Sequence, residues 1–443
     1  MTRPTFVFSL SLGALCPALN ACVAHTAKPG ETADSTDTDT APDDSIPTIP
    51  DSDSTTETDT DESTDSVESG DTGDVPAPPT PDIIVDCNGG GDHLTIAAAI
   101  TAAISGTTIG LMPCTYTENV NFIGKAVDIY GIDGSAVTTI EGLGSGPVIT
   151  AIRGETIGTR LAGVTVTGGG GDYGAGLLMD GSVLALEDVV FTGNNRTYAV
   201  VYGQGISVTM IDVDFHDNRF HSGGVVTYID NGNMLAERLY LSCGSADMGI
   251  YQHNATLLLD STIDCPDASY AVYVDSSEFA SFRSRITGGN VGVYGADSAD
   301  TFNERMWLFN SIVVGTEVAV KSNYMHFKAD NVVFWGGTKG LDIYSCHADS
   351  YVYNSAFHGT ECAMEGDPTE YAIGWNSVGD SDYCRTSGFS TIVGDPMFVD
   401  PPNDFHLLPG SPLIDAGDPD GDHDDADGSR CDVGGYGGLQ GAW

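Results

Sequence analysis

Positive charge is the scarcest feature of this sequence. Its 443 residues include 16 Lys and Arg against 63 Asp and Glu, which gives a formal net charge of -47. No Lys or Arg occurs between Lys28 and Lys125. Nucleic-acid binding requires basic side chains that neutralise phosphates, so this composition excludes it. The composition suits neutral ligands and divalent cations, and it suits polyanionic sugars poorly unless a cation bridges them.

Long apolar runs and paired metal-ligand motifs are also missing. After residue 22 there is no run of 18 apolar residues, which excludes a transmembrane helix there. No Cys-x-x-Cys pair occurs, so the ligand spacing typical of a zinc site is absent.

The sequence instead repeats one short phrase from Leu161 to Ser377: apolar, any, Asn- or Asp-like, small, any, apolar. Its ten copies begin at residues 161, 186, 210, 236, 258, 281, 308, 329, 352 and 374. Each copy contains short alternating apolar runs separated by Gly, Asn and Asp, a pattern typical of strands. So regular a spacing predicts a solenoid, and three strands per copy predict an all-β, right-handed parallel β-helix.

The third residue of each phrase is expected in the tight bend between the second and third strands of a coil. Asn and Asp tolerate left-handed backbone geometry at such bends. We therefore assign these residues a structural role in turns rather than a catalytic one: Asp188, Asp212, Asp260, Asn310, Asn331, Asn354 and Asn376.

Residues 1–22 have the layout of an export signal, with a basic start and a short apolar run. Their end, Leu19-Asn20-Ala21-Cys22, resembles the lipobox of bacterial lipoproteins. That resemblance implies a lipid on Cys22 as the membrane anchor, and Val23 after it favours the outer membrane. An ordinary signal peptide cut near Ala24 is the alternative.

Three further regions follow this signal. Residues 23–80 are rich in Asp, Thr, Ser and Glu and are expected to be a disordered acidic linker. Residues 81–393 are expected to form the β-helix, opened by a helix that Asp92 caps and that covers the exposed end. Residues 394–443 form a C-terminal cap.

The two ends of the solenoid resemble known families. The order of elements in residues 81–146 resembles the N-terminal part of the pectin-lyase-like superfamily, and Pro113-Cys-Thr-Tyr-Thr-Glu118 is similar to a segment of pectin methylesterases. Residues 394–401 and 404–418 resemble the C-terminal cap of surface proteins of the right-handed β-helix repeat family. The catalytic motifs of pectin methylesterases and polygalacturonases are absent. The resemblance therefore implies fold and caps, and no active site.

Besides Cys16 and Cys22, eight cysteines remain, and an even number in an exported chain indicates disulfides. Cys243 and Cys265 occupy the same place in successive phrases, so we expect them to lie on adjacent coils and to bond. Two sets of partners are open for the last four cysteines. The expected pairs are Cys87–Cys114, then either Cys362–Cys384 with Cys346–Cys431, or Cys346–Cys362 with Cys384–Cys431.

One residue of each first strand is expected to point outward. Those positions are Leu178, Val201, Val226, Tyr251, Tyr273, Tyr294, Lys321 and Asp342. Three successive tyrosines would form a row about 10 Å long, whose flat aromatic surface suits stacking against sugar rings. The alternative is an aromatic ladder that only stabilises adjacent strands.

Four titratable residues on this face are candidates for catalysis: His253, Asp275, Lys321 and Asp342. A lyase similar to the calcium-dependent pectate lyases would need acidic cation ligands and a Lys or Arg base, a role that Lys321 could fill. A surface ion pair between Lys321 and Asp342 is the alternative.

Six Asp occur between residues 418 and 427. Asp alternating with Gly resembles calcium-binding loops, although the twelfth-position Glu of an EF-hand is missing. The predicted ligands are Asp418, Asp420, Asp422, Asp424 and Asp427. A solvated acidic loop is the alternative.

These observations predict a lipid-anchored, extracytoplasmic, monomeric β-helix at the outer membrane or cell surface. We expect it to bind carbohydrate or to adhere through the outer face of the first sheet, with an extracellular polysaccharide or cell-surface glycan as partner. A polysaccharide lyase or glycoside hydrolase using the same face, and a purely structural envelope component, are the alternatives.

Overall fold

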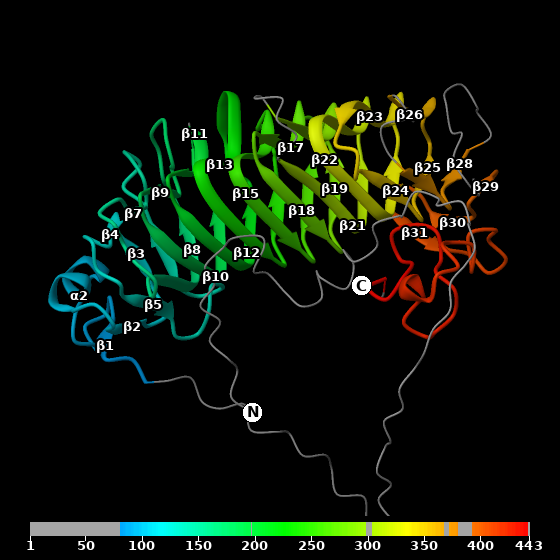
Figure 1. Ribbon diagram of the computed structural model, residues 1–443. Coiled ribbons are helices and arrows are strands. Elements are labelled where there is room, and N and C mark those ends of the chain that lie inside the picture. The colour runs from blue at the N-terminus through cyan, green and yellow to red at the C-terminus, as the bar shows by residue number, and fades with distance from the viewer. Residues whose placement is uncertain (1–79, 196, 298–303, 367–371, 380–391, 442–443) are drawn as a thin grey trace, which may run out of the picture. The chain divides into compact units, whose positions relative to one another are not determined.

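A computed structural model describes residues 80–195, 197–297, 304–366, 372–379 and 392–441, with the side chain of Asp422 left out. The part from Thr80 onward belongs to one compact unit. It is a right-handed parallel β-helix, as predicted, and the strands of its main sheet pair in parallel with strands of the adjacent coils (Figure 1). Three sheets run along the solenoid, and several long strands bend from one sheet into the next.

The first sheet is formed by strands that follow the coil-to-coil connections. Its strands are β4 (Val120–Asn121), β7 (Ile149–Ala151), β9 (Leu177–Asp180), β11 (Thr197–Gln204), the first part of β13 (Phe220–Glu237), the first part of β15 (Met248–Leu259), β17 (Tyr270–Asp275), β20 (Val291–Ala296), the first part of β22 (Val318–Trp335), β23 (Lys339–Cys346) and β26 (Cys362–Glu365).

The second sheet is entered by a turn from the first. Its strands are β1 (Ile83–Val85), β2 (Thr108–Leu111), β5 (Asp128–Gly131), the first parts of β8 (Arg160–Thr167), β10 (Val183–Thr192), β12 (Ser207–His216) and β21 (Arg305–Val314), with β18 (Glu278–Phe282), β24 (Tyr351–Tyr353), β27 (Ala372–Gly374) and middle or later parts of β13, β15 and β22.

The third sheet completes each coil. Its strands are β3 (Thr115–Thr117), β6 (Thr139–Glu141), β14 (Tyr240–Ser242), β16 (Thr262–Cys265), β19 (Arg285–Gly288), β25 (Ala356–His358), β28 (Ser377–Val378), β29 (Ile392–Val393) and the last parts of β8, β10, β12, β21 and β22.

Helix α2 (Ile96–Ala102) lies at the N-terminal end of the solenoid, as predicted (Figure 1). It buries Ile96, Ala99 and Ile100, which join the core of the first coils. The helix is a short lid, since seven residues make only two turns.

The cap of α2 differs from the prediction. Thr95 is the N-cap and accepts a hydrogen bond from the Ala98 N–H at 3.3 Å. Asp92 instead accepts the N–H of Ile84 at 2.9 Å, in the first strand. The carboxylate of Glu118 accepts hydrogen bonds from two N–H groups at the start of the helix, where a negative charge is favoured.

The bends between the second and third sheets are those expected from the phrase. Six of the seven predicted residues adopt left-handed backbone, with φ between 46° and 54°: Asp188, Asp212, Asp260, Asn310, Asn331 and Asn354. Asn376 does not, so the left-handed backbone expected for it is wrong, although its buried side chain does play a structural role by hydrogen-bonding to the backbone of Ser355 and Val352. Strand pairing sets Gly374 opposite Tyr353, so Trp375 takes the left-handed position with φ 50°.

The interior is filled by side chains that stack from coil to coil. Phe191 and Phe215 stack with ring centroids 4.8 Å apart, and Phe334 and Phe357 with centroids 4.5 Å apart. All four rings are essentially inaccessible to solvent. Such in-register stacking follows from the coil spacing of about 4.8 Å.

The C-terminal residues cover the outer face of the third sheet. The antiparallel strands β30 (Phe398–Asp400) and β31 (Asp404–Leu407), the 3-10 helix η2 (Gly421–His423) and the loops around them form this cap. Cap residues form one apolar cluster with outward side chains of the sheet. The cluster comprises Ile312, Val333, Ala356, Phe398, Phe405, Leu413 and Val433.

Three turn asparagines tie this cap to the solenoid. The side-chain amides of Asn310 and Asn331 donate to the carbonyls of Gly437 and Asp432, at 2.6 and 2.8 Å. The side-chain oxygen of Asn354 accepts the N–H of Asp418 at 2.7 Å. The predicted structural role of these residues thus extends to holding the cap.

Candidate functional site

Five tyrosines form one row on the outer face of the first sheet. Strand pairing aligns Tyr202 with Tyr228, Tyr228 with Tyr251, Tyr251 with Tyr273, and Tyr273 with Tyr294. All five side chains are partly exposed. The structure therefore brings together the three predicted tyrosines and adds two that the sequence pattern missed.

The two tyrosines were missed because the register of their strands differs by one or two residues from the expected one. Val201 and Val226 were expected to point outward, but both are fully buried. Val201 pairs with Leu177 and with Thr227, so the outward positions move to Tyr202 and Tyr228. The signal was present in the sequence as an aromatic residue one or two positions after the expected one.

The rings of this row stack on one another. Adjacent centroids are 5.0, 4.5 and 5.6 Å apart from Tyr202 to Tyr273, with interplanar angles of 3°, 5° and 12°. Tyr294 is tilted by 37° from Tyr273. Because each face is occupied by the neighbouring ring, the row offers ring edges and phenol hydroxyls to solvent. The expected continuous flat surface for sugar stacking is not what this geometry provides.

Two more exposed tyrosines lie near this row, Tyr173 next to its start and Tyr344 two rungs past its end. Tyr173 is 55 % exposed and meets Tyr202 edge-on, with centroids 5.0 Å apart. Tyr344 is 63 % exposed and lies on β23. These rings, which sequence reasoning did not single out, are the ones with faces open enough to stack against a sugar.

A row of polar side chains accompanies the tyrosines, two residues further along each strand. Strand pairing aligns Asp180 with Gln204 and Asp230, and Asp275 with Ala296 and Asn323. His253 and Asp275 directly follow the paired residues Gln252 and Val274. The polar row thus comprises Asp180, Gln204, Asp230, His253, Asp275 and Asn323.

Hydrogen bonds connect the two rows. The Tyr251 hydroxyl donates to Asp275 Oδ2 at 3.4 Å, and Asn323 Nδ2 donates to the Tyr294 hydroxyl at 3.0 Å. His253 Nδ1 lies 2.9 Å from Asp230 Oδ1. Burial raises the pKa of Tyr251, and the carboxylates of Asp275 and Asp230 raise it further. The Tyr251 phenol therefore stays protonated and acts as a hydrogen-bonding group.

The four candidates for catalysis share this face but do not form one cluster. Asp275 lies two rungs before the rung of Lys321, a distance of about 10 Å along the solenoid. Lys321 Nζ is 4.0 Å from Asp342 Oδ2, and Lys339 Nζ is closer to the same carboxylate at 3.1 Å. Lys321 and Asp342 therefore belong to a charged continuation of the tyrosine row, together with Lys339.

The Asp-rich segment of the cap uses its carboxylates locally. Asp418 Oδ1 accepts the N–H of Asp420 at 3.0 Å, and Asp427 Oδ1 accepts the N–H of Ser429 at 2.9 Å. Within the described ranges, no three His, Cys, Asp or Glu side chains gather as metal ligands would. The side chain of Asp422 lies outside what is described, and Asp424 shows no such grouping, so calcium binding here stays a prediction.

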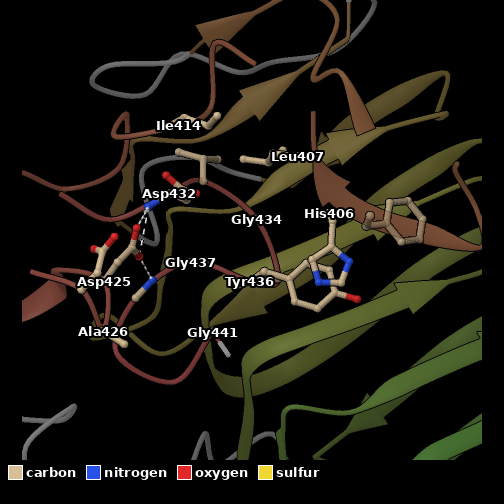
Figure 2. Close-up of a pocket in the computed structure, with 15 residues that line it drawn as sticks. His406, Leu407, Ile414, Asp425, Ala426, Asp432, Gly434, Tyr436, Gly437 and Gly441 are labelled. Atoms are coloured by element: carbon tan, nitrogen blue, oxygen red, sulfur yellow. Dashed lines mark hydrogen bonds between the residues drawn. The ribbon is translucent and has the colours of Figure 1, made fainter. Parts of the chain in front are cut away.

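A pocket in the cap is a separate candidate site (Figure 2). His406 and Tyr436 stack at its mouth, with centroids 3.8 Å apart. Asp425 accepts hydrogen bonds from the N–H groups of Asp432 and Gly438. Burial raises the pKa of both Asp425 and Asp432. Because these hydrogen bonds hold the cap's loops together, we read the pocket as part of the cap's architecture.

The cysteines follow the predictions in part. Cys87–Cys114 and Cys243–Cys265 are disulfides. Cys431 is a buried free thiol that hydrogen-bonds with Asn331, so both predicted pairings of Cys431, with Cys346 or with Cys384, are wrong. Cap packing holds Cys431 beside the solenoid turn instead. Cys362 is disulfide-bonded. Of the two partners predicted for it, Cys346 does not form this disulfide, and Cys384 lies outside the described residues.

The N-terminal predictions fall outside the described ranges. Cys22, its lipid and the acidic linker all precede residue 80 and stay predictions. Within the ranges that the structure covers, no helix is long and apolar enough to cross a membrane.

Among known proteins, several solved structures are similar to this chain. No family model matches the sequence, and neither does any curated protein. Pectate lyase Pel9A is 14 % identical, with 78 % of this chain and 91 % of that chain covered and a TM-score of 0.37. The catalytic domain of GH87 α-1,3-glucanase in complex with nigerose is 12 % identical, with 71 % and 70 % covered and a TM-score of 0.35.

A third similar structure is the A-module of mannuronan C-5 epimerase AlgE4 of Azotobacter vinelandii. It is 11 % identical, with 67 % of this chain and 93 % of that chain covered and a TM-score of 0.32. Scores this low carry no argument about the site. The fold assignment rests on the strand pairing described above, and the function must be argued from this chain's own residues.

Proposed function

We propose that this protein is a carbohydrate-binding protein whose ligand lies along the outer face of the first sheet. The observation that carries the proposal is the pair of parallel rows, five tyrosines beside six polar side chains, on one sheet face where these side chains are at least partly exposed. Solenoids use such extended surfaces to bind long ligands. A polysaccharide is long, linear and rich in hydroxyls, so it matches a surface that repeats the same groups at every coil.

The contacts in this proposal are hydrogen bonds along the row and stacking at its ends. Phenol hydroxyls both donate and accept, and the carboxylates of Asp230 and Asp275 accept from sugar hydroxyls. The exposed rings of Tyr173 and Tyr344 supply aromatic faces, which bury apolar surface of a sugar ring at small entropic cost. This division of roles replaces the continuous stacking surface that the sequence suggested.

The export signal, the lipid on Cys22 and the acidic linker complete the proposal. They would place the binding face outside the cytoplasm and away from a membrane, at the outer membrane or cell surface. An acidic spacer remains extended because like charges repel. Labelling with a radioactive fatty acid, compared between wild type and Cys22→Ala, tests the anchor, and equal labelling would refute it.

An enzyme acting on the same polysaccharide is the second candidate. It is favoured by His253, which lies 2.9 Å from Asp230 and beside Asp275 in the middle of the face. Such a group suits proton transfer. The enzyme would be established if a bound polysaccharide released reducing ends or unsaturated sugars and if this release were lost in His253→Gln. Binding without turnover would establish the binding protein.

A glycan array probed with the full chain tests the proposal. Binding is expected to fall at least tenfold in Tyr173→Ala and in Tyr344→Ala. The matched control is Tyr240→Ala, because Tyr240 is 41 % exposed but lies on the third sheet. Unchanged binding in both end variants, or an equal loss in the control, would overturn the assignment of the face. No binding to any glycan would favour a structural envelope protein.

A further inference from the structure

Three carboxylates, those of Asp180, Asp230 and Asp275, lie beside the tyrosine row. Asp180 is exposed, and Asp230 and Asp275 are partly exposed. Among the described residues, no ion pair formed by Lys or Arg involves any of these three. The carboxylate of Asp230 pairs with the imidazole of His253, and that of Asp275 accepts hydrogen bonds from the hydroxyls of Tyr251 and Ser276.

Elsewhere the few basic residues are used to pair carboxylates. Arg238 binds Asp212, and Arg283 binds Asp260, each with its Nε 2.6 Å from a carboxylate oxygen. Arg160 bridges two acidic residues on the second sheet, and Lys339 pairs with Asp342 where the tyrosine row ends. With 16 Lys and Arg against 63 Asp and Glu, the chain leaves negative charge at many sites. Here the charge coincides with the proposed binding face.

The phenols of the row report the same negative field. Burial raises the pKa of Tyr202, of Tyr228 and of Tyr273, and nearby carboxylates add to the increase. The carboxylates that act on these phenols include Asp180, Asp230 and Asp275. A uronic-acid polymer would bring its own carboxylates into this field, and an ammonium group would be attracted to it.

We propose that the ligand of this face is an amine-bearing polysaccharide, a polymer of glucosamine type, whose ammonium groups pair with Asp230 and Asp275 while its hydroxyls bind the tyrosine row. Asp230 and Asp275 lie two rungs apart, about 10 Å along the solenoid, which is comparable with the length of a disaccharide. The inference rests on the proposed function, since it names the substrate class of the same site.

Three oligosaccharides of equal length test the inference with the full chain: fully deacetylated chito-oligosaccharide, its fully N-acetylated form, and oligogalacturonate. Isothermal titration calorimetry at pH 6 is expected to show at least tenfold tighter binding of the deacetylated form than of the acetylated form. The affinity for the deacetylated form should fall as the salt concentration is raised, because exposed charges are screened. Oligogalacturonate should bind most weakly.

Substitution of the carboxylates sharpens the test. Asp230→Asn and Asp275→Asn should each reduce the affinity for the deacetylated form three- to tenfold, and the double variant should bind both chito-oligosaccharides equally. Asp133→Asn is the matched control. Asp133 is exposed in a turn of the first coils, and its substitution removes the same charge. An equal loss in the control would mean that only net charge matters and would overturn the inference.

The possible outcomes distinguish failure of the proposed preference for amines from failure of the proposed carbohydrate binding. If the acetylated form binds as tightly as the deacetylated form, the preference for amines is wrong and carbohydrate binding stands. If polylysine binds but no oligosaccharide does, both are wrong, because the face then attracts cations of any kind.

Discussion

The outer faces of the first and third sheets differ in what covers them. On the third sheet, outward Ile312, Val333 and Ala356 are aliphatic or small, and cap residues such as Phe405 pack over them. On the first sheet, outward tyrosines and carboxylates remain partly exposed. The same coil geometry produces both faces, so in-register stacking alone does not mark a binding site. The chain buries the face that water disfavours and leaves open the one rich in hydrogen-bonding groups.

The largest expected effect on stability comes from weakening the packing of the cap on the third sheet. Phe405 is 1 % exposed and contacts Trp335 and Phe398, with centroids 5.2 and 5.1 Å apart. Phe405→Ala should lower the free energy of unfolding by about 3–5 kcal/mol, as for other buried phenylalanines. Urea denaturation measures it. Tyr251→Ala, on the open face, should cost about 1–2 kcal/mol, and equal losses would contradict the contrast between the faces.

Removing the disulfide between adjacent coils should come next. Cys243 and Cys265 are buried and 22 residues apart. Replacing both with Ala should cost about 3 kcal/mol, chiefly because the unfolded chain gains freedom. Thermal unfolding of the variant checks this value. Since neither residue lies on the first-sheet face, glycan affinity at 25 °C should stay unchanged, and a drop in affinity would mean that the face depends on this link.

Acid should weaken the capped face before the open one. His358 is 5 % exposed under the cap, and burial lowers its pKa to about 4. The unfolded chain takes up a proton below about pH 6.5 and the folded chain does not. The contribution of the neutral His358 to stability is therefore fully present above about pH 6.5 and is lost as the pH drops towards 4.

At pH 4 this loss should reach about 2–3 kcal/mol. His358→Gln can keep a hydrogen bond to Ser377 and should remove the contribution of His358 to this pH dependence. Urea midpoints at pH 7 and pH 4 measure it. His221→Gln is the control, because the side chain of His221 is 53 % exposed. A pH dependence equal to that of wild type in His358→Gln would assign the effect to other groups.

The smallest change in stability should come from removing one hydroxyl of the tyrosine row. Tyr251→Phe keeps the stacked ring and loses the hydrogen bond to Asp275. The free energy of unfolding should change by less than about 1 kcal/mol, and glycan affinity should fall about two- to tenfold. Calorimetry measures the affinity. An unchanged affinity would show that the row is an aromatic ladder with no direct role in binding.

Much of the fold was predictable because its signals are local and periodic. The left-handed bends at residues such as Asp188 and Asn354, the Cys243–Cys265 disulfide and the alignment of Tyr251, Tyr273 and Tyr294 follow from phrase position. A coil of nearly constant length fixes which residues become neighbours. The predictions fail where coil length or register changes, as at Tyr202, Tyr228 and Trp375.

The nearly even intervals between turns in the sequence are enough to predict that residues about two dozen positions apart stack. The folded structure is needed to establish which way the stacked rings face, which outer face the C-terminal residues cover, and that Cys431 is a thiol. Ring orientation depends on packing against adjacent coils, and the cap lies over turns 64 to 127 residues earlier in the chain. Contacts at that range leave no regular spacing in the sequence.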